Sequence, residues 1–347
     1  MPNQYPLRAI LPGLAFAVAL AVAAKGVSIA SGGAVSAVLC AIVLGILWRN
    51  LAGLGGWAEP GLEFAGETLL RIGIALIGLR LTLAVLADVS VTAVPVVIAC
   101  IAVALMAAVG LGRLLGVAPG IGRLLAAGTA ICGCTAIIAV APLLRAQKAD
   151  VGIAISCVVL FGSIAMLGYP WLAGIVFGSE LLPAGMFLGA SIHDTSQVVG
   201  ASLIYAEHFD APDAVAIAGL TKFLRTLGLL VLVPAAAMWM ARSESMPATD
   251  QPRELRRRAV PWFVMVFVAL VVARTVGDQF AGELMGRWLQ LLAGAQRVSE
   301  LLLLCGMAAV GLGITFSHLR EASWRPVLLS FLAAVLTGAC ALALLLL

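Results

Sequence analysis

GTAICGCTAII, from residue 128 to residue 138, and GASIHDTSQVV, from residue 189 to residue 199, are two copies of one motif in the middle of the chain. Each copy is followed by an aspartate that opens a long apolar segment and by a proline near its end, Asp150 and Pro170 or Asp213 and Pro234. Gly, Ser, Thr and Cys crowd both copies, although the flanking sequence is typical of membrane helices. Irregular backbone inside a membrane is tolerated only where it is buried in protein or lines a cavity. The motif therefore predicts two broken helices, and a duplicated break points to the binding site of a transporter.

The composition indicates an integral membrane protein. Of the 347 residues, 63% are hydrophobic and 11% are charged, and the mean hydropathy is +1.12. Soluble proteins carry about 25% charged residues. The runs are apolar on every face, which favours helices over the alternating strands of a barrel. We therefore expect an all-α integral membrane fold surrounded by membrane lipid, and the net charge of +4 gives no reason to expect a nucleic-acid partner.

Nine runs are long enough to cross a membrane, which takes about 20 residues with tolerance for shorter runs. They cover residues 9–24, 33–48, 67–86, 91–112, 151–177, 213–240, 259–277, 298–317 and 325–347. The two broken segments, 119–145 and 183–205, bring the expected total to about 9–11 transmembrane helices in a single polytopic domain over residues 1–347. The first run resembles a signal peptide, but Lys25 follows it directly and we expect no cleavage.

One hydrophilic linker, residues 241–259, sets the expected orientation. It carries four arginines, which place it in the cytoplasm by the positive-inside rule. Counting spans from this linker puts the N-terminus in the cytoplasm and the C-terminus in the periplasm of a bacterial inner membrane. The first broken segment then has both ends inside, near Arg113 and Arg145, and the second has both ends outside, beside the acidic loop at 207–213. Charge bias thus favours two re-entrant hairpins from opposite faces, with two fully crossing broken helices as the alternative.

A second, fainter repeat supports an inverted arrangement. GIALIGLRLT, residues 73–82, matches GMAAVGLGIT, residues 306–315, and the same counting makes the two spans run in opposite directions. Inverted repeats place a transporter's substrate near the midplane of the membrane, at the interface between the repeats.

The broken segments supply small, polar groups that suit a bound anion. Free N–H groups at a helix start, aided by the helix dipole, form an anion site. The predicted substrate-binding residues of these segments are Thr129, Cys132, Gly133, Thr135, Ser191, Thr195, Ser196 and Gln197. The alternative is that small residues merely let membrane helices approach closely, as they commonly do.

His193 and Asp194 form the most polar pair in the apolar part of the chain. An ionisable group within a membrane segment is a functional hypothesis by default. A histidine can accept and release a proton near neutral pH, which would couple transport to H⁺. We expect Asp194 to bind a coupling cation such as Na⁺ or to hold the histidine tautomer. The alternative is that Asp194 caps a helix N-terminus.

Lys222 and Arg225 are the predicted sources of anion attraction. They lie three residues apart on one helical face, about ten residues into an apolar span. Arginine suits bidentate recognition of oxyanions. Arg71 and Arg274 lie nearer span ends, where such side chains snorkel to the interface. The chain has no GxxxxGK[ST] loop, which disfavours ATP-driven transport by this chain alone.

Cys132 and Cys134 align with His193 and Asp194 between the two copies, so a metal cluster is conceivable if the two breaks meet. A C-x-C pair lacks the spacing of zinc sites, and we expect neither a metal nor a cofactor. An intramembrane metalloenzyme with Cys132, Cys134 and His193 as ligands is the alternative from another functional class. The seven cysteines lie in apolar runs and predict no disulfide framework.

With GTAICGCTAIIAVAPLL, GASIHDTSQVVGA and the later LTKFLR at 220–225, nearly the whole chain resembles the YeiH-type sulfate exporter family of bacterial inner-membrane proteins. The resemblance implies a fold of the cation/proton antiporter and anion transporter superfamily, with crossed discontinuous segments, a scaffold domain and often a homodimer. It also implies secondary transport by alternating access. We therefore predict export of a small inorganic or organic anion, such as sulfate or a related sulfur oxyanion, coupled to H⁺ or Na⁺, and no enzymatic activity. The alternative transport function is cation/proton exchange with Asp194 as the ion carboxylate.

Overall fold

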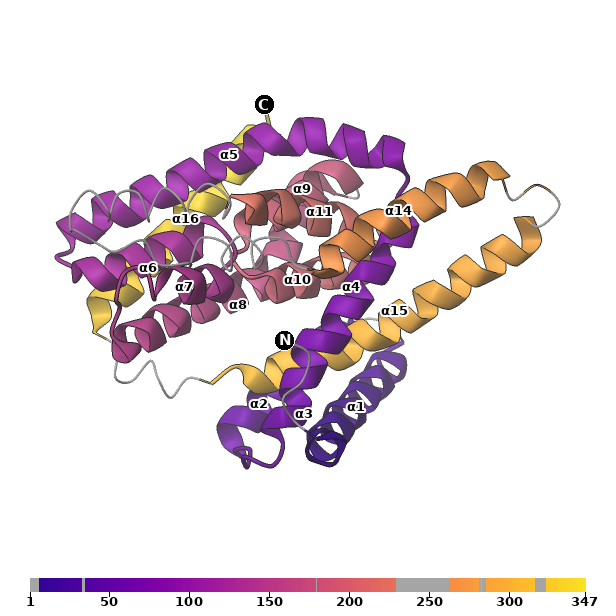
Figure 1. Cartoon of the computed structure of the whole chain (residues 1–347), viewed down its shortest axis with the longest axis horizontal. Helices are drawn as coiled ribbons and strands as arrows, with labels where there is room; N and C mark the ends of the chain where they lie inside the picture. The colour runs from indigo at the N-terminus through magenta and orange to yellow at the C-terminus, as the bar shows by residue number, and fades with distance from the viewer. Residues whose placement is uncertain are drawn as a thin grey trace. The chain divides into compact units, whose positions relative to one another are not determined.

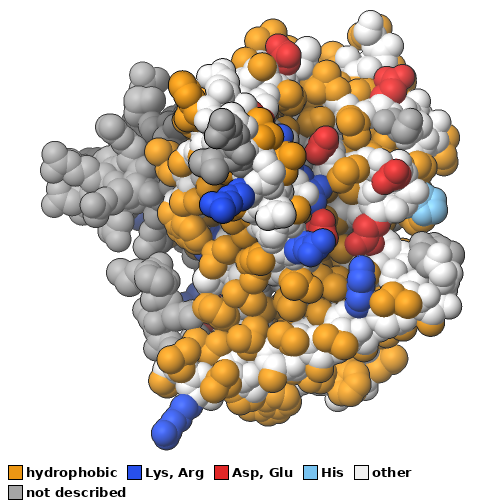
Figure 2. Space-filling model, turned by 90° about the vertical axis from the view of Figure 1, so that its right-hand side faces the viewer, with side chains coloured by type: hydrophobic (Ala, Val, Ile, Leu, Met, Phe, Trp, Pro, Cys, Tyr) orange, Lys and Arg blue, Asp and Glu red, His pale blue; other side chains and the backbone are white. Residues whose placement is uncertain are grey.

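The structure is a computed structural model, and it describes residues 6–32, 35–178, 180–228, 262–280, 282, 285–315 and 323–347. Within these residues the fold is helical and contains no strand, which confirms the all-α prediction (Figure 1). Six described helices are long and apolar enough to cross a membrane: α1 (Leu7–Ala30), α5 (Leu83–Leu114), α8 (Lys148–Phe177), α14 (Trp262–Phe280), α15 (Met285–Gly313) and α16 (Trp324–Leu345). Hydrophobic side chains cover a large part of the face drawn in Figure 2. The chain is thus a multi-pass membrane protein.

The remaining described helices are shorter. They are α2 (Ala37–Leu51), α3 (Glu59–Glu63), the π-helical η1 (Phe64–Leu69), α4 (Leu70–Ile77), the 3-10 turn η2 (Gly78–Arg80), α6 (Pro119–Ala130), α7 (Cys134–Val140), α9 (Leu181–Ser191), α10 (Thr195–His208) and α11 (Ala214–Leu227). The span expected at 67–86 is not one continuous helix, because Leu81 is extended and α5 begins at Leu83. The cytoplasmic linker predicted at 241–259 and Pro234 lie outside the described residues.

The contacts of the chain group it into two compact units. Unit 1 contains residues 1–87, 199–216 and 262–315, and unit 2 contains residues 88–198, 217–261 and 316–347. Both copies of the duplicated motif fall in unit 2, except for the last residue of the second copy, Val199. Unit 2 therefore carries every predicted site residue.

Unit 1 is held together by close helix approaches at glycines. On α2 and α15, Gly45 and Gly311 face each other, and a Cβ added at Gly45 would lie 2.8 Å from the Gly311 carbonyl carbon. Small residues at such contacts let membrane helices pack backbone to backbone. The helices on which the two stretches of the fainter repeat begin, α4 and α15, also touch here: the Ser299 hydroxyl donates to the Gly73 carbonyl at 2.8 Å, while Gly306 faces Leu70. This register makes α4 and α15 antiparallel; the inverted repeat itself stays a prediction.

In unit 2 the first broken helix is packed by apolar side chains. One cluster joins Leu124 and Leu125 of α6, Ile137 of α7 and Val158 of α8, all fully buried. Gly128 completes this contact, because an added Cβ would lie 2.8 Å from the Ile137 side chain. The two halves of the first broken segment are thus packed against each other and against α8.

Candidate functional site

Both copies of the duplicated motif interrupt a helix. α6 ends at Ala130 and α7 begins at Cys134, whereas α9 ends at Ser191 and α10 begins at Thr195. Gly133 has φ +64° and ψ −127°, a conformation that is essentially restricted to glycine. Ile192 is extended, with φ −80° and ψ 141°. The discontinuities thus fall inside the quoted motifs, while the choice between hairpins and crossing segments stays a prediction.

Lys222 of α11 binds the ends of both broken helices. Its Nζ donates to the Ile131 carbonyl at 3.0 Å, the Ile192 carbonyl at 2.9 Å and the His193 carbonyl. An ammonium group has three donors, so all of them are engaged by backbone oxygens. The Lys222 side chain is 1% exposed, and it joins the two breaks at one point.

Arg225 lies one turn further along α11 and makes the same connection. Its Nε donates to the Ala130 carbonyl at 2.8 Å, and its terminal nitrogens donate to the carbonyls of Thr129, Ala190 and Ile192. The guanidinium is fully buried. The last carbonyls of α6 and α9 would otherwise lack partners, because a helix C-terminus leaves its final four carbonyls unbonded.

Electrostatics explains why two cations are buried here. The C-terminus of a helix carries roughly half a negative charge, and the ends of α6 and α9 converge on Lys222 and Arg225. A buried charge is tolerated when it is compensated and fully hydrogen-bonded. The hydrogen bonds of Lys222 and Arg225 therefore hold the two broken helices together. Attraction of an anion by their charge stays a prediction.

A glycine allows α11 to approach α9 closely. A Cβ added at Gly189 would lie 2.5 Å from the Ala218 carbonyl oxygen and 2.7 Å from the Thr221 side chain. Ala218, Thr221, Lys222 and Arg225 have the i, i+3, i+4 and i+7 spacing of one helix face. The first glycine of the second motif copy therefore brings both cations within reach of the break.

The two breaks also contact each other through Asp194 and Gly133. A Cβ added at Gly133 would lie 3.0 Å from Asp194 Oδ2. Asp194 Oδ1 accepts the Ser196 N–H at 3.0 Å and the Ser196 hydroxyl at 2.6 Å. Asp194 thus performs the capping role at the start of α10, while its second oxygen is turned toward the other break.

His193 and Thr129 carry buried polar atoms without partners among the described residues. Both ring nitrogens of His193 and the Thr129 hydroxyl have no hydrogen bond there, and the two side chains are 1% and 0% exposed. Buried polar groups are normally paired, so each exception requires an explanation. The backbone carbonyls of the same two residues are bound by Lys222 and Arg225, which places both exceptions at the breaks.

The other predicted residues differ in exposure. Ser191 is buried and its hydroxyl donates to the Phe187 carbonyl of its own helix at 2.6 Å, whereas Thr195 and Ser196 are half-buried. Cys132 is buried, Cys134 is half-buried and Thr135 is exposed. No group of three His, Cys, Asp or Glu side chains suited to a metal is found in the part of the chain that the structure describes. The proposed ligand set of Cys132, Cys134 and His193 is therefore not brought together.

Comparisons with known proteins agree with the membrane fold. The family model described as "Conserved hypothetical protein 698" matches residues 12–330. The chain belongs to this family. A UPF0324 membrane protein of Yersinia pestis is 32% identical, over 85% of this chain and 80% of the relative. The UPF0324 inner membrane protein YeiH of Escherichia coli K12 is 30% identical, over 92% and 89%, and a UPF0324 membrane protein of Agrobacterium fabrum is 29% identical, over 100% and 96%. No solved structure matches this chain.

In this UPF0324 family member, Gln197 ties α10 to α8. Its Nε2 donates to the Val159 carbonyl at 3.0 Å and to the Ser163 hydroxyl at 3.2 Å, and its Oε1 is buried without a partner among the described residues. Ser163 and Gly162 belong to the site but are absent from the sequence prediction. A small-residue pair inside the apolar run at 151–177 is the only signal that could have marked them.

Gly162→Ala is expected to displace Gln197, because the new Cβ would overlap with Gln197 Oε1. Loss of the two amide hydrogen bonds should lower the free energy of unfolding by about 1–3 kcal/mol. Gly168→Ala is the matched control on α8, since an added Cβ there meets nothing within 4 Å. The free energy of unfolding of both variants is measured in detergent and compared with that of wild type. A Gly162→Ala penalty that persists undiminished in a Gln197→Ala background would contradict the assigned contact.

Proposed function

We propose that this chain is a secondary transporter of a small anion in the bacterial inner membrane, with its substrate site at the two helix breaks. The observation that carries the proposal is the convergence of both broken helices on Lys222 and Arg225. Discontinuous helices that meet inside a membrane protein form the substrate and ion sites of many transporters. The membrane-protein names of the relatives and the six apolar helices support this class.

The balance of charge favours an anion. Two buried cations, Lys222 and Arg225, face one half-buried carboxylate, Asp194. The C-termini of α6 and α9 offset part of this positive charge, whereas the N-termini of α7 and α10 add partial positive charge at the same breaks. An uncompensated buried charge is costly, so the excess positive charge is best balanced by a bound anion.

The unpaired side chains at the breaks supply the polar contacts in this proposal. The Thr129 hydroxyl and one protonated nitrogen of His193 can each donate a hydrogen bond to an oxyanion. Sulfate or a related sulfur oxyanion fits such donors. In this proposal His193 would also exchange the coupling proton, because an imidazole can accept and release a proton. In this proposal Lys222 and Arg225 attract the anion by their charge and hold the two breaks together. The bound anion accepts its hydrogen bonds from Thr129 and His193. The proposal assigns no enzymatic activity to the chain.

Cation/proton exchange is the second candidate, and the position of Asp194 favours it. Asp194 is the carboxylate at the breaks, and its Oδ2 points toward Gly133 of the opposite break. This function predicts that Asp194→Asn abolishes transport, whereas substitution of Lys222 or Arg225 affects stability alone. The anion proposal predicts that removal of either cation also removes anion binding in any protein that still folds.

A thermal-shift screen of the purified chain separates these functions. Sulfate, sulfite, thiosulfate, a sulfonate and a carboxylate are each added with and without sodium. A ligand at 100 times its dissociation constant stabilises the folded state by about 2.7 kcal/mol. We expect at least one sulfur oxyanion to raise the unfolding midpoint. A shift with sodium alone, and with none of the anions, would favour cation exchange.

His193→Gln should abolish the pH dependence of this anion-induced shift, because the glutamine does not titrate. His208→Gln is the matched control, since His208 is exposed at the end of α10. The shift is measured over a pH series from about pH 4 to pH 8, so that titration in the acid range is also followed. An unchanged pH profile in His193→Gln would contradict the coupling role.

A further inference from the structure

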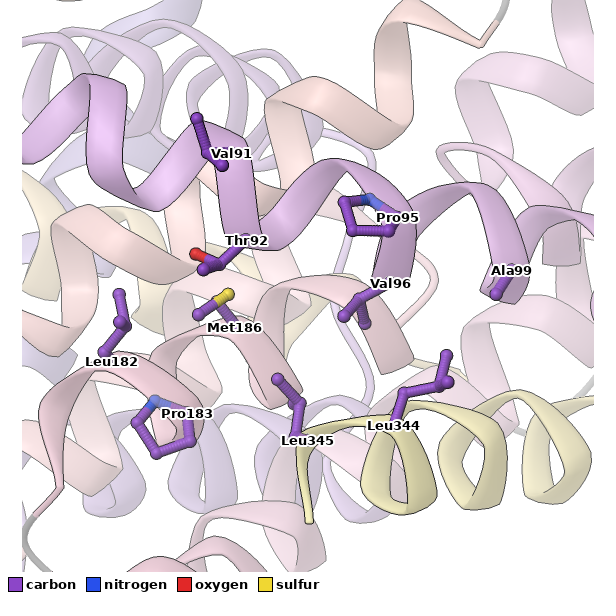
Figure 3. Close-up of a pocket in the computed structure, with 10 residues that line it drawn as sticks. All are labelled: Val91, Thr92, Pro95, Val96, Ala99, Leu182, Pro183, Met186, Leu344 and Leu345. Atoms are coloured by element: carbon purple, nitrogen blue, oxygen red, sulfur yellow. The ribbon is translucent and has the colours of Figure 1, made fainter. Parts of the chain in front are cut away.

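A groove of about 530 Å³ lies between α5, α9 and α16 of unit 2 (Figure 3). This volume is within the range of ligand pockets, about 300–1,000 Å³. Figure 3 draws the lining residues of α5, α9 and α16 as sticks. The groove uses Leu182 and Pro183 in the first turn of α9 and Met186 in its middle, whereas the break lies beyond the end of that helix. It is therefore distinct from the candidate transport site.

The lining of the groove suits a hydrocarbon chain. Thr92 supplies the one polar side chain among the lining residues, and its hydroxyl donates to the Asp88 carbonyl at 3.0 Å. Val91, 76% exposed, lies at the rim, and Val96, 7% exposed, lies at the base. A polar ligand would find few hydrogen-bond partners in the groove. A hydrocarbon chain would make van der Waals contacts with the apolar side chains that line it.

Charge identifies which end of the groove meets the membrane surface. Asp88 lies one helical turn before Thr92 on the same face of α5, and Glu180 directly precedes α9; both are exposed. The basic residues of α5 and α16 lie at the other ends of these helices, with Arg113 in the last turn of α5 and Arg325 in the first turn of α16. By the positive-inside rule the acidic end faces away from the cytoplasm.

We propose that the groove binds one acyl chain of a phospholipid of the outer leaflet whose headgroup carries an ammonium, phosphatidylethanolamine being the chemical match. The acyl chain fills the space between α5, α9 and α16, and the ammonium lies beside Asp88 and Glu180. Anionic lipids are disfavoured at this end because both nearby charges are negative. This inference is independent of the proposed transport function, since neither break contributes to the groove.

The test uses the full chain, delipidated in detergent and supplied with phosphatidylethanolamine or phosphatidylglycerol of identical acyl chains. Bound lipid is counted by native mass spectrometry and the unfolding midpoint is recorded. We expect phosphatidylethanolamine to be retained and to raise the midpoint more than phosphatidylglycerol does. Equal retention and equal shifts with the two lipids would overturn the headgroup assignment.

Three variants locate the site. Ala99→Trp fills the groove and should weaken lipid retention at least about tenfold, because several chain methylenes lose their burial. Ile98→Trp is the control, since Ile98 is 61% exposed on the same helix and is not a lining residue. Asp88→Asn lies outside the packed core and should reduce the headgroup preference while chain binding remains. Wild-type retention by Ala99→Trp, or an unchanged preference in Asp88→Asn, would contradict the proposal.

Discussion

Arg225→Met should lower the free energy of unfolding by about 4 kcal/mol or more, because the carbonyls of Thr129, Ala130 and Ala190 lose the Arg225 donor in a fully buried setting, while that of Ile192 keeps only Lys222. An unsatisfied buried polar group costs about 1–3 kcal/mol. The unfolding midpoint in detergent should then fall by about 10 °C. The methionine keeps a similar length and remains apolar, so the change isolates the loss of hydrogen bonds and charge.

Two further variants make this result specific. Arg225→Lys keeps the charge but loses the planar set of donors. Its unfolding midpoint should therefore lie between those of wild type and Arg225→Met. Arg297→Leu removes an exposed arginine from α15 and should change the midpoint little. If Arg225→Met unfolds at the wild-type temperature, the two breaks are not held by α11 as the hydrogen bonds indicate.

Gly133→Ala should cost about 1–3 kcal/mol from backbone strain alone, because φ +64° with ψ −127° is a glycine conformation. The new Cβ would also press against Asp194, whose Cα would lie 3.2 Å away. The substitution should therefore separate the two breaks and abolish ligand-induced stabilisation in the anion screen, even in protein that remains folded.

Gly122→Ala is the matched control for this substitution. Gly122 lies within α6, and an added Cβ meets nothing within 4 Å. Alanine is favoured over glycine in a helix by up to about 1 kcal/mol, so the control should be neutral or slightly stabilising. Equal ligand responses in Gly133→Ala and Gly122→Ala would show that the contact between the breaks is not needed for binding.

The duplicated motif was sufficient to predict where the helices break, because glycine and hydroxyl residues are unusual within apolar runs. The sequence also placed Lys222 and Arg225 on one face of a buried segment. It did not show that their donors bind the backbone carbonyls at the ends of α6 and α9, because that depends on tertiary approach. The close approach of α9 and α11 occurs at Gly189 and Ala218. The spacing of residues along one helix does not show which residues of another helix they contact.

The structural roles of Gln197 and Asp194 also could not be settled from the sequence. Gln197 was predicted to bind substrate, and that role stays a prediction; the sequence did not show that its amide nitrogen anchors α10 on α8 through Val159 and Ser163, a contact between segments 34 or more residues apart. Asp194 was weighed both as a coupling group and as a cap, and the structure shows the cap. The coupling role stays a prediction because it concerns proton or sodium exchange, which a single conformation does not report.

Transport by reconstituted protein tests the central claim most directly. The chain is placed in proteoliposomes with an imposed pH or sodium gradient, and uptake of the sulfur oxyanion that gives the largest thermal shift is followed over time. We predict gradient-dependent uptake by wild type and by Gly122→Ala, and none by Gly133→Ala. Uptake of Na⁺ or H⁺ without any anion flux, or anion uptake by Gly133→Ala at the wild-type rate, would contradict an anion site at the two helix breaks.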